Sequence, residues 1–454
     1  MSVGKLPEGW IKTEIGDIAE IISGGTPKSG NADNFAPTGE GVAWLTPADL
    51  SGYKKKYVAR GARDLSIVGY SSCSAKLIPA GAILFSSRAP IGYVAVASNE
   101  IATNQGFKSF VFTDDIYPDY AYYYLRNIRH LAEEKGTGTT FKEISGSSAK
   151  TLPFVIAPLG EQKIIAEKLD TLLAQVDSTK ARLEQIPKIL KRFRQAVLFA
   201  AVNGELTKNW RKGKEFQCDS LELGKLANFI DYRGKTPTKT NSGIPLITAK
   251  NIRQGYISQE PREYIDEADY DKWMTRGIPK RGDVLITTEA PMGYVANILN
   301  IEGKFALAQR AICLQFKESI DSFFASIYMQ SSIFQQKLHE NATGSTVKGI
   351  KASLLKKIPV IFPPILEQAE IVRRVEQLFA YADTIEKQVN NALARVNNLT
   401  QSILAKAFRG ELTEQWRAEN PELISGDNSA AALLEKIKAE RAASTGKKAS
   451  RKKS

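Results

Sequence analysis

The chain has 454 residues, a mass of 50.0 kDa and a net charge of +13, and 43% of its residues are hydrophobic. This length is too great for one ordinary core, and no apolar run approaches the roughly 20 residues that a bilayer span needs. The cysteines are isolated, which argues against disulfide or zinc scaffolding, and the positive charge fits either a polyanionic partner or a merely basic soluble protein.

Residues 1–157 mix short strands with turns. The first residues, MSVGKLPEGW, contain no apolar signal core, so we expect a cytoplasmic protein. The run GAILFSSRAPIGYVAVA is apolar and is broken by Pro and Gly, which predicts strands, whereas YAYYYLRNIRHLAE, from Tyr120 to Glu133, predicts a helix. We therefore expect an α+β domain in this region.

Residues 158–210 predict a long helix. Apolar residues there alternate steps of four and three, with Thr179 as the one polar member of the series. This spacing keeps one seam facing a partner helix, as in a coiled coil, and the alternative is an amphipathic helix packed on a globular core. Pro187 is expected to kink the helix and Gly204 to end it as a C-cap glycine. The seam consists of Ile165, Leu169, Leu172, Val176, Thr179, Leu183, Ile186, Leu190, Phe193 and Val197.

The octapeptide GELTKNWR at 204–211 returns as GELTEQWR at 410–417. The same offset aligns Pro158-x-x-Glu161-Gln162 with Pro364-x-x-Glu367-Gln368. Self-similarity over about 200 residues indicates a duplicated, domain-sized unit. We therefore predict a second α+β domain at 211–363, with a helix from Phe323 to Leu338, and a second long helix at 364–417 that ends at Gly410.

The second helix carries the same rhythm. At a rise of roughly 1.5 Å per residue, the seam of this helix is about 48 Å long. The two seams can pack on each other within one chain, as a long antiparallel two-helix coiled coil with pseudo-twofold symmetry and a globular domain at each end. Residues 418–454 then form a C-terminal segment whose basic end is expected to be disordered. The second seam consists of Ile371, Val375, Leu378, Ala382, Ile385, Val389, Ala392, Val396, Leu399 and Ile403.

Motifs for catalysis are not found. His130 and His339 lie in predicted helices without ligand partners at metal spacing, and the segment SGGTPKSG from Ser23 to Gly30 lacks the spacing of a nucleotide-binding loop. That segment is open to two readings, a phosphate cradle or a plain turn. Asp119 and Glu133-Glu134-Lys135 fit a loose nuclease pattern, but an intervening helix would hold the carboxylates roughly 20 Å apart. We expect no metal site and no catalysis.

Two duplicated variable domains, two Pro-x-x-Glu-Gln helices and repeated Gly-Glu-Leu-Thr segments together resemble the specificity subunits of type I restriction-modification enzymes. The resemblance covers the whole chain and is strongest from Pro158 to Arg211 and from Pro364 onward, regions that look like the spacer regions of the family. The segment RAENPELISGDNSAAALLEKIKAERAAS looks like the enterobacterial, K-type (IA-like) subfamily.

The resemblance implies a division of labour. Each variable domain is a target recognition domain that reads one half of a split DNA sequence, and the coiled coil sets the gap between the halves. Two modification subunits, which bind S-adenosylmethionine and methylate adenine, dock on the spacer regions, and two restriction subunits add ATP- and Mg-dependent cleavage. This chain is then a non-catalytic subunit without a cofactor of its own.

Base edges are read by Arg, Lys, Asn and Gln, so we searched predicted loops and matched positions for these residues. For any one of them, the alternative is a solvated surface side chain. The predicted DNA-binding residues are Lys28, Arg88, Gln105, Lys142, Lys235, Lys239, Lys250, Arg253, Gln309, Arg310 and Lys348. The predicted docking residues for the modification subunits are Glu161, Gln162, Trp210, Glu367, Gln368 and Trp416.

Two rival functions stay open on the residues alone. A coiled-coil scaffold that binds no DNA would explain the helices but would leave two large divergent domains without a role. A nucleic-acid enzyme with an overlooked site would show Mg²⁺-dependent cleavage by the isolated chain.

Overall fold

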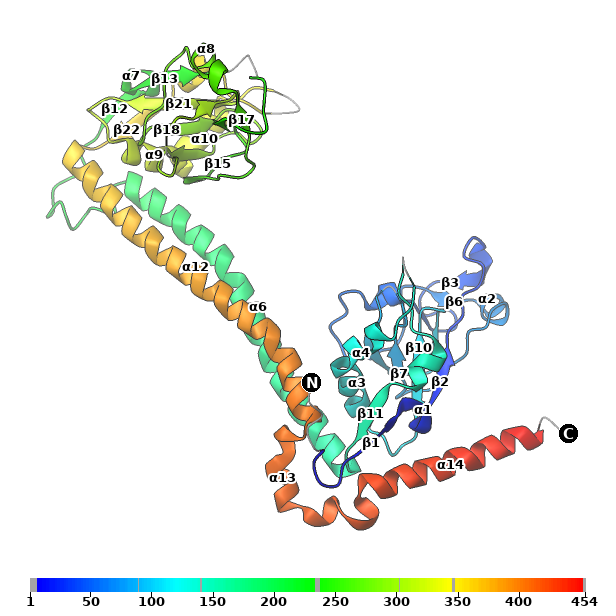
Figure 1. Cartoon of the computed structure of the whole chain (residues 1–454). Coiled ribbons are helices and arrows are strands. Elements are labelled where there is room, and N and C mark those ends of the chain that lie inside the picture. Colours follow the sequence, from blue (N-terminus) through cyan, green and yellow to red (C-terminus); the bar gives the residue numbers. More distant parts are fainter. Residues whose placement is uncertain are drawn as a thin grey trace. The chain divides into compact units, whose positions relative to one another are not determined.

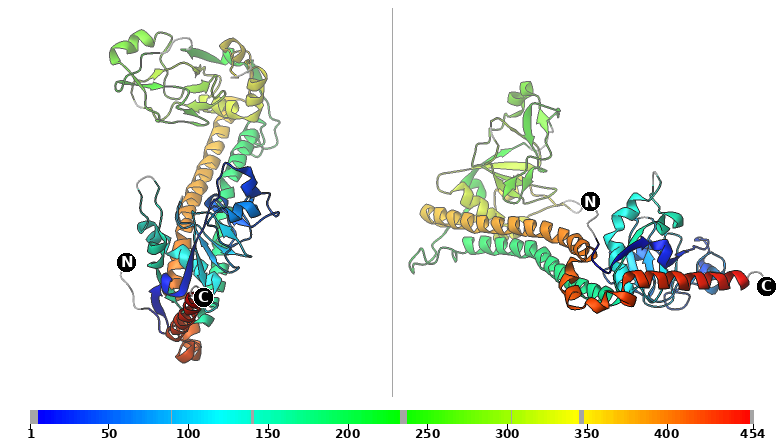
Figure 2. Two further views of the ribbon diagram at one scale, coloured as in Figure 1. Left: turned by 90° about the vertical axis from the view of Figure 1, so that its right-hand side faces the viewer. Right: turned by 60° about the horizontal axis from the view of Figure 1, so that its bottom comes forward.

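A computed structural model describes residues 6–88, 90–138, 141–232, 237–301, 303–344 and 348–451, with side chains up to residue 443 (Figures 1 and 2). The chain folds into two compact units. Unit 1 contains residues 1–182 and 393–454, and unit 2 contains residues 183–392. The division falls inside the two long helices, so each unit combines one globular part with a stretch of both helices. We describe each unit by itself.

The globular part of unit 1 is built around a five-stranded sheet in the order β2-β10-β7-β8-β5. A separate antiparallel pair, β1 with β11, joins the start of the chain to the segment before the first long helix. The elements are β1 (Ile11–Glu14), α1 (Ile15–Ile18), β2 (Ala19–Ser23), β3 (Phe35–Ala36), β4 (Trp44–Leu45), β5 (Tyr57–Val58), β6 (Asp64–Leu65), α2 (Ile67–Ser71), β7 (Ile83–Phe85), β8 (Val94–Ala97), β9 (Ala102–Thr103), β10 (Lys108–Phe112), α3 (Pro118–Asn127), α4 (Arg129–Glu134), α5 (Gly146–Lys150) and β11 (Pro153–Ile156).

Unit 2 repeats this plan. Its main sheet has the order β13-β21-β18-β19, the counterpart of β2-β10-β7-β8, and β12 pairs with β22 as β1 pairs with β11. The elements are β12 (Asp219–Glu222), α7 (Leu223–Leu226), β13 (Ala227–Asp231), β14 (Ile244–Ile247), β15 (Ile252–Arg253), β16 (Tyr256–Ile257), β17 (Tyr264–Ile265), α8 (Tyr270–Trp273), β18 (Val284–Thr287), β19 (Val295–Asn297), β20 (Ala306–Leu307), β21 (Ala311–Phe316), α9 (Ser322–Gln330), α10 (Ser332–Glu340), α11 (Ala352–Leu355) and β22 (Pro359–Phe362). The predicted duplicated α+β fold is confirmed.

Two predicted helices are each split in two. The helix expected from Tyr120 to Glu133 breaks at Ile128, whose ψ of 12° leaves the helical range. The helix expected from Phe323 to Leu338 breaks at Ser331, which is extended and whose hydroxyl caps α10 by accepting from the Phe334 amide. The prediction of continuous helices was wrong because the apolar pattern continues through both breaks.

The long helices α6 (Leu159–Val202) and α12 (Ile365–Phe408) have 44 residues each. In unit 1 the start of α6 packs on the end of α12, through Ile165, Leu169 and Leu404. In unit 2 the end of α6 packs on the start of α12, through Val197, Ile371 and Val375. The two helices therefore run antiparallel within each unit.

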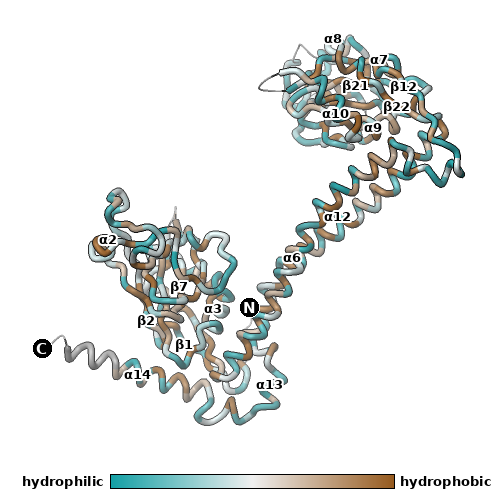
Figure 3. The backbone as a smooth tube through the Cα atoms, turned by 180° about the vertical axis from the view of Figure 1, so that it is seen from behind, coloured by the Kyte–Doolittle hydropathy of each residue, from teal (hydrophilic) through white to brown (hydrophobic). Residues whose placement is uncertain are grey.

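Burial along both helices follows the predicted seams. In α12, every seam residue from Ile371 to Val396 is buried or half-buried, and Leu399, 43% exposed, is the first exception. In α6 the one fully exposed seam position is the polar Thr179. Figure 3 shows the resulting alternation of hydrophobic and hydrophilic residues along the helices. Pro187 lies inside α6 without ending it, since the helix continues to Val202, and its kink stays a prediction.

Gly204 and Gly410 follow the ends of the two helices, as predicted. Their φ angles are +80° and +76°, in the left-handed region that favours glycine at a helix C-terminus. A Cβ at Gly204 would run into the Phe216 ring, and one at Gly410 into Pro7. Both the backbone angle and the lack of space therefore require glycine.

The C-terminal segment continues unit 1. After the short α13 (Glu414–Glu419), helix α14 (Ala430–Arg451) buries Ala430, Leu434 and Ile437 in the core of that unit. Lys436 of this helix forms an ion pair with Asp115 at 2.9 Å. The described helices contain no segment long and apolar enough to span a membrane.

Candidate functional site

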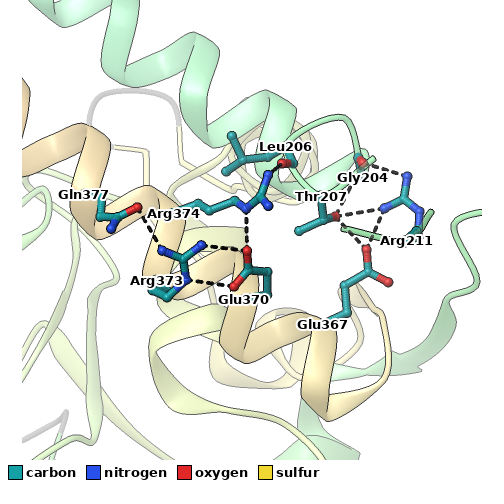
Figure 4. A network of polar contacts seen from close by, with 9 residues as sticks. All are labelled: Gly204, Leu206, Thr207, Arg211, Glu367, Glu370, Arg373, Arg374 and Gln377. Carbon is teal, nitrogen blue, oxygen red and sulfur yellow. Dashed lines mark hydrogen bonds and ion pairs between the residues drawn. The ribbon is translucent and has the colours of Figure 1, made fainter. Parts of the chain in front are cut away.

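The repeated octapeptide makes a buried clamp in unit 2 (Figure 4). Glu367, only 5% exposed, accepts hydrogen bonds from the Thr207 hydroxyl and from Arg211 Nη1, each at 2.6 Å. Arg211 Nη2 also donates to the carbonyl of Gly204 at 2.8 Å. One carboxylate near the start of α12 thus holds the turn that ends α6. Nearby, Arg374 of α12 donates to the carbonyl of Leu206 at 2.7 Å.

Unit 1 contains the same clamp. Glu161 is fully buried and accepts from the Thr413 hydroxyl at 2.6 Å and from Arg417 Nη1 at 2.5 Å. Arg417 Nη2 donates to the Gly410 carbonyl at 2.7 Å. The octapeptide occurs twice because both long helices need it. Each helix has a glutamate in its first turn, and the arginine of the octapeptide at the end of the other helix pairs with that glutamate. A buried carboxylate without such a partner is strongly destabilising.

The glutamine next to each glutamate fastens the globular part to its helix. Gln162 donates to the Ala157 carbonyl at 2.9 Å and accepts from the Tyr117 amide at 2.8 Å. Gln368 donates to the Pro363 carbonyl at 2.7 Å and accepts from the Asp321 amide at 2.8 Å. In each case the side chain fixes the residue just before α3 or α9.

These contacts revise the predicted docking residues. Glu161, Gln162 and Gln368 are fully buried and Glu367 is nearly so, and all four bond within their own unit, so their side chains are not available to a partner. Trp210, by contrast, is 42% exposed. Trp416 is half-buried, with its ring beside Gly160. Of the six predicted docking residues, the two tryptophans are the ones with solvent-exposed surface.

The two clamps differ in one residue that the repeat did not reveal. In unit 1 the indole of Trp10 donates to Glu161 Oε2 at 2.7 Å. The matched pairing of β1 with β11 and of β12 with β22 places Cys218 at the corresponding position of unit 2. Cys218 is exposed, and partial desolvation of its thiol, followed by the charge of Glu367, raises the pKa of the thiol to about 11.

Three loops of unit 1 meet at the end of its main sheet and carry three predicted DNA-binding residues. Ser87 N donates to the Gly106 carbonyl at 2.7 Å, and Ile144 N donates to the Ser87 carbonyl at 3.0 Å. Arg88 and Gln105 are next to one of these joints and Lys142 is two residues from one, and Gln105 and Lys142 are exposed. Arg88 lies 3.6 Å from Glu143, which also lies 3.8 Å from Lys108. We call this arrangement the three-loop site.

Unit 2 has the same joints. Thr288 N donates to the Arg310 carbonyl at 2.9 Å and Ile350 N to the Thr288 carbonyl at 3.0 Å. Around them the charges are rearranged, because the position of Arg88 is taken by Glu289, whose carboxylate pairs with Arg310 at 3.0 Å. The two units thus present different side chains on one backbone frame.

A cleft of about 270 Å³ lies at the three-loop site of unit 2. Four predicted DNA-binding residues line it: Lys239, Lys250, Gln309 and Arg310. Glu263 enters the same cleft and pairs with Lys239 at 2.8 Å. Lysine, arginine and glutamine donors gathered around an open cleft suit the acceptor-rich edges of bases and phosphates.

The other predicted DNA-binding residues are more scattered. Lys28 is exposed on the glycine-rich segment Ser23–Gly30, and Lys348 is exposed at the third loop of unit 2. Arg253 lies away from the cleft and lines a different cavity. Lys235 lies outside the described residues. The sequence of an irregular loop does not show which of its residues lie close together in the fold.

The glycine-rich segment packs on protein. A Cβ at Gly24 would meet the Asn104 carbonyl, and one at Gly25 would meet the Ala75 amide. Gly25 N donates to the Thr103 carbonyl at 2.9 Å. These glycines permit close contact with the turn that carries Gln105, which favours the plain turn over the phosphate cradle.

Sequence reasoning overlooked the acidic partners Glu143, Glu263 and Glu289, since the search considered only donors. It also overlooked Phe141, which is 73% exposed beside Lys142. Phe141 could have been identified from the sequence, because it is a large apolar residue within a polar loop.

The suspected nuclease carboxylates do not converge. Asp119 is bound by Lys56 at 2.6 Å and by the Tyr57 hydroxyl, whereas Glu133 pairs with Arg129 at 2.8 Å. Lys56 also pairs with Asp170 of α6 at 2.7 Å, so this cluster ties the globular part of unit 1 to its helix. Over the portion of the chain with described placement, no group of three or more potential metal ligands occurs.

Fold and sites together define a tandem binding protein, with two related domains that present different side chains on one frame. Residues 7–188 and 219–395 match the family described as "Type I restriction modification DNA specificity domain". The chain is 41% identical to the type I restriction enzyme EcoKI specificity subunit of Escherichia coli K12, with 100% of both chains covered. It is 50% identical to the EcoBI specificity subunit of Escherichia coli, with 70% of each covered.

A solved structure shows the same fold. It is the HsdS subunit from Thermoanaerobacter tengcongensis, with a TM-score of 0.60, 19% identity and coverage of 90% of this chain and 99% of the other. The chain belongs to the specificity subunits of type I restriction-modification systems and is similar to their enterobacterial, K-type members. Such a subunit serves DNA recognition, not catalysis, as the sequence predicted.

Proposed function

We propose that each globular part reads one half of a bipartite, asymmetric site in double-stranded DNA. The observation that carries this proposal is the pair of three-loop sites, in which Arg88, Gly106 and Glu143 of unit 1 are replaced by Glu289, Arg310 and Gly349 of unit 2. Identical backbone frames with exchanged charges offer different donors and acceptors to the DNA. The two half-sites therefore differ in sequence.

The helices α6 and α12 form one antiparallel coiled coil through both units and set the gap between the half-sites. A seam of about 48 Å corresponds to roughly 14 base pairs at 3.4 Å each, so half-sites several base pairs apart are within reach. Support comes from the burial pattern, which follows the 4-3 spacing in both units.

Two adenine-N6 methyltransferase subunits dock on the repeated regions around Trp210 and Trp416, and two restriction subunits join through them. S-adenosylmethionine, ATP and Mg are bound by these partners. Adenine methylation requires the base to leave the stack, so the recognition domains hold the flanking duplex while the partner acts.

The first experiment is to co-express the chain with its modification subunit in a host without adenine methylation and to map N6-methyladenine across the genome. We expect one split, asymmetric motif that is methylated on both strands. A confirmed complex of the two proteins without any motif would reject the proposal and favour the scaffold.

A further inference from the structure

Unit 2 contains a second, larger cavity, of about 970 Å³, between α6 and the globular part. Its outstanding feature is a set of amide side chains from the helix, the β15–β16 hairpin and the α9–α10 region. We call this cavity the glutamine groove, after its five glutamines Gln195, Gln254, Gln330, Gln335 and Gln336.

The groove is basic. Lys191, Arg253 and His339 line it, and none of the lining residues is an aspartate or a glutamate. Glu340 accepts from Gln336 Nε2 at 2.9 Å and lies outside the lining. Lys191 is exposed on α6, and Arg253 Nη1 donates to the carbonyl of Ile252 at 3.4 Å. The cations of the groove therefore lack carboxylate partners among its lining residues.

One loop joins the groove to the cleft of the three-loop site. Ala290 lines the cleft, and Met292, Gly293 and Tyr294, a few residues later, line the groove. A ligand that passes from one to the other meets Arg310 and Lys250 on one side of this loop and Arg253 and Lys191 on the other.

The corresponding place in unit 1 is different. At the offset of the repeat, Gln195 corresponds to Gln401, and Lys191 corresponds to the uncharged Asn397. Gln401 Nε2 donates to the Asn127 carbonyl of the globular part at 3.3 Å. The cation on the helix is therefore specific to unit 2, which argues against a feature inherited only for packing.

We propose that the glutamine groove holds the phosphate backbone of duplex DNA beside the half-site that unit 2 reads. The proposal rests on the proposed function and adds a contact that carries no sequence information. Gln330, Gln335 and Gln336 donate their amide groups within unit 2, to Ser326, Gly293 and Glu340. Lysine and arginine attract phosphate by charge, and the amides of Gln195 and Gln254 can donate hydrogen bonds to its oxygens. The absence of acidic lining residues removes the repulsion that would oppose a polyanion.

The test uses the full chain in complex with its methyltransferase subunits and the variant Lys191→Gln, which keeps the size and polarity of the side chain. Binding is measured against salt concentration on two duplexes, one with the methylated motif and one with that motif scrambled. We expect the slope of log K against log[salt] to become less steep by about one unit on both duplexes, and binding at low salt to weaken at least about threefold. The motif that is methylated stays unchanged.

Lys188→Gln is the matched control, because Lys188 is exposed one turn away on α6 and does not line the groove. It is expected to leave the slope unchanged. If Lys191→Gln instead weakens assembly with the methyltransferase subunit at an unchanged slope, the groove binds protein and the proposal is wrong. An unchanged slope with unchanged assembly also rejects it. Failure of the proposed function itself would be seen separately, as equal binding of both duplexes by the unaltered complex.

Discussion

Two buried carboxylates, Glu161 and Glu367, impose the strictest requirement at the scale of single residues. Each lies at the start of a long helix, and each is neutralised by an arginine from the turn that ends the other helix. Arginine suits this task because its rigid fork binds the carboxylate and a backbone carbonyl together. Both glutamates are buried, and the arginine side chains are only 10% and 13% exposed, so removal of either member of a pair leaves an uncompensated charge or donor.

Arg211→Met is therefore expected to lower the free energy of unfolding by about 3–5 kcal/mol. The methionine side chain fills part of the space of the arginine but leaves Glu367 without its cation. Urea unfolding of the full chain measures the change. Arg262→Met is the control, since Arg262 makes an exposed pair with Glu260, and its midpoint should stay near that of the unaltered chain. Equal effects of the two substitutions would contradict the clamp.

Glu370 predicts a pH dependence. Its hydrogen bond from Arg373, and a further one from Arg374, lower the pKa of its carboxyl from 4.5 to about 2. A carboxyl with a lowered pKa in the folded state stabilises the fold above its unfolded pKa and loses that contribution as pH falls through the folded value. The difference in unfolding free energy between the unaltered chain and Glu370→Gln should thus be constant above pH 4.5 and shrink toward pH 2. A difference that stays constant down to pH 2 would contradict the pairing.

Sequence reasoning reached these residues only in part. The repeat identified Glu161, Thr207 and Arg211 with their counterparts, but it could not show that they meet, since Glu161 and Arg417 are 256 positions apart. It assigned the glutamates to a partner because exposure is not visible in a pattern. The acidic members of the three-loop site were missed for a similar reason, as irregular loops have no periodicity from which contacts can be deduced.

At the scale of elements, the long helices were the most predictable part of the molecule. A 4-3 spacing over ten positions leaves few alternatives, and the buried residues of α12 follow it from Ile371 to Val396. The short helices were less predictable. Ile128 and Ser331 interrupt apolar runs that read as continuous helices, because a break of one residue changes the backbone without changing the hydrophobic pattern.

Pro187 is a weak point of α6 that a substitution can remove. It lies inside the helix, is exposed, and withholds one backbone donor. Pro187→Ala is expected to raise the free energy of unfolding by up to about 3 kcal/mol. Thermal unfolding of the full chain gives the comparison, with Lys188→Ala as a control on the same turn. A fall in stability after Pro187→Ala would mean that the local shape of α6 depends on the proline.

We expect the methyltransferase subunit to bind the tryptophans of the repeated turns. Trp210→Ala should weaken binding of the methyltransferase subunit about tenfold or more, as removal of a buried aromatic anchor does in other interfaces. Titration calorimetry or a pull-down at graded concentrations provides the measurement. Tyr381→Ala removes another exposed aromatic, 63% exposed on α12, and should have no effect. Equal affinity for all three proteins would exclude docking through Trp210.

At the scale of the whole molecule, the chain passes between the two units twice, within α6 at residues 182–183 and within α12 at residues 392–393. Insertion of seven residues at each of these two points would preserve the 4-3 seam and lengthen each helix by about 10 Å. The methylated motif should then keep both half-sites and widen its gap by about three base pairs. Methylome mapping shows the result. Longer helices with an unchanged gap between the half-sites of the motif would mean that the helices do not set this gap.

The clamp of unit 1 has a topological consequence. Glu161 binds Trp10 from the beginning of the chain and Arg417 from near its end, so a single carboxylate closes the polypeptide into a ring. In such a ring, the place where the polypeptide is opened into two termini matters little. A circular permutant opened at the exposed turn around Gly213, with its old ends joined, would keep every hydrogen bond of both clamps. The two globular parts could thus be encoded in the opposite order with the same hydrogen bonds in both clamps.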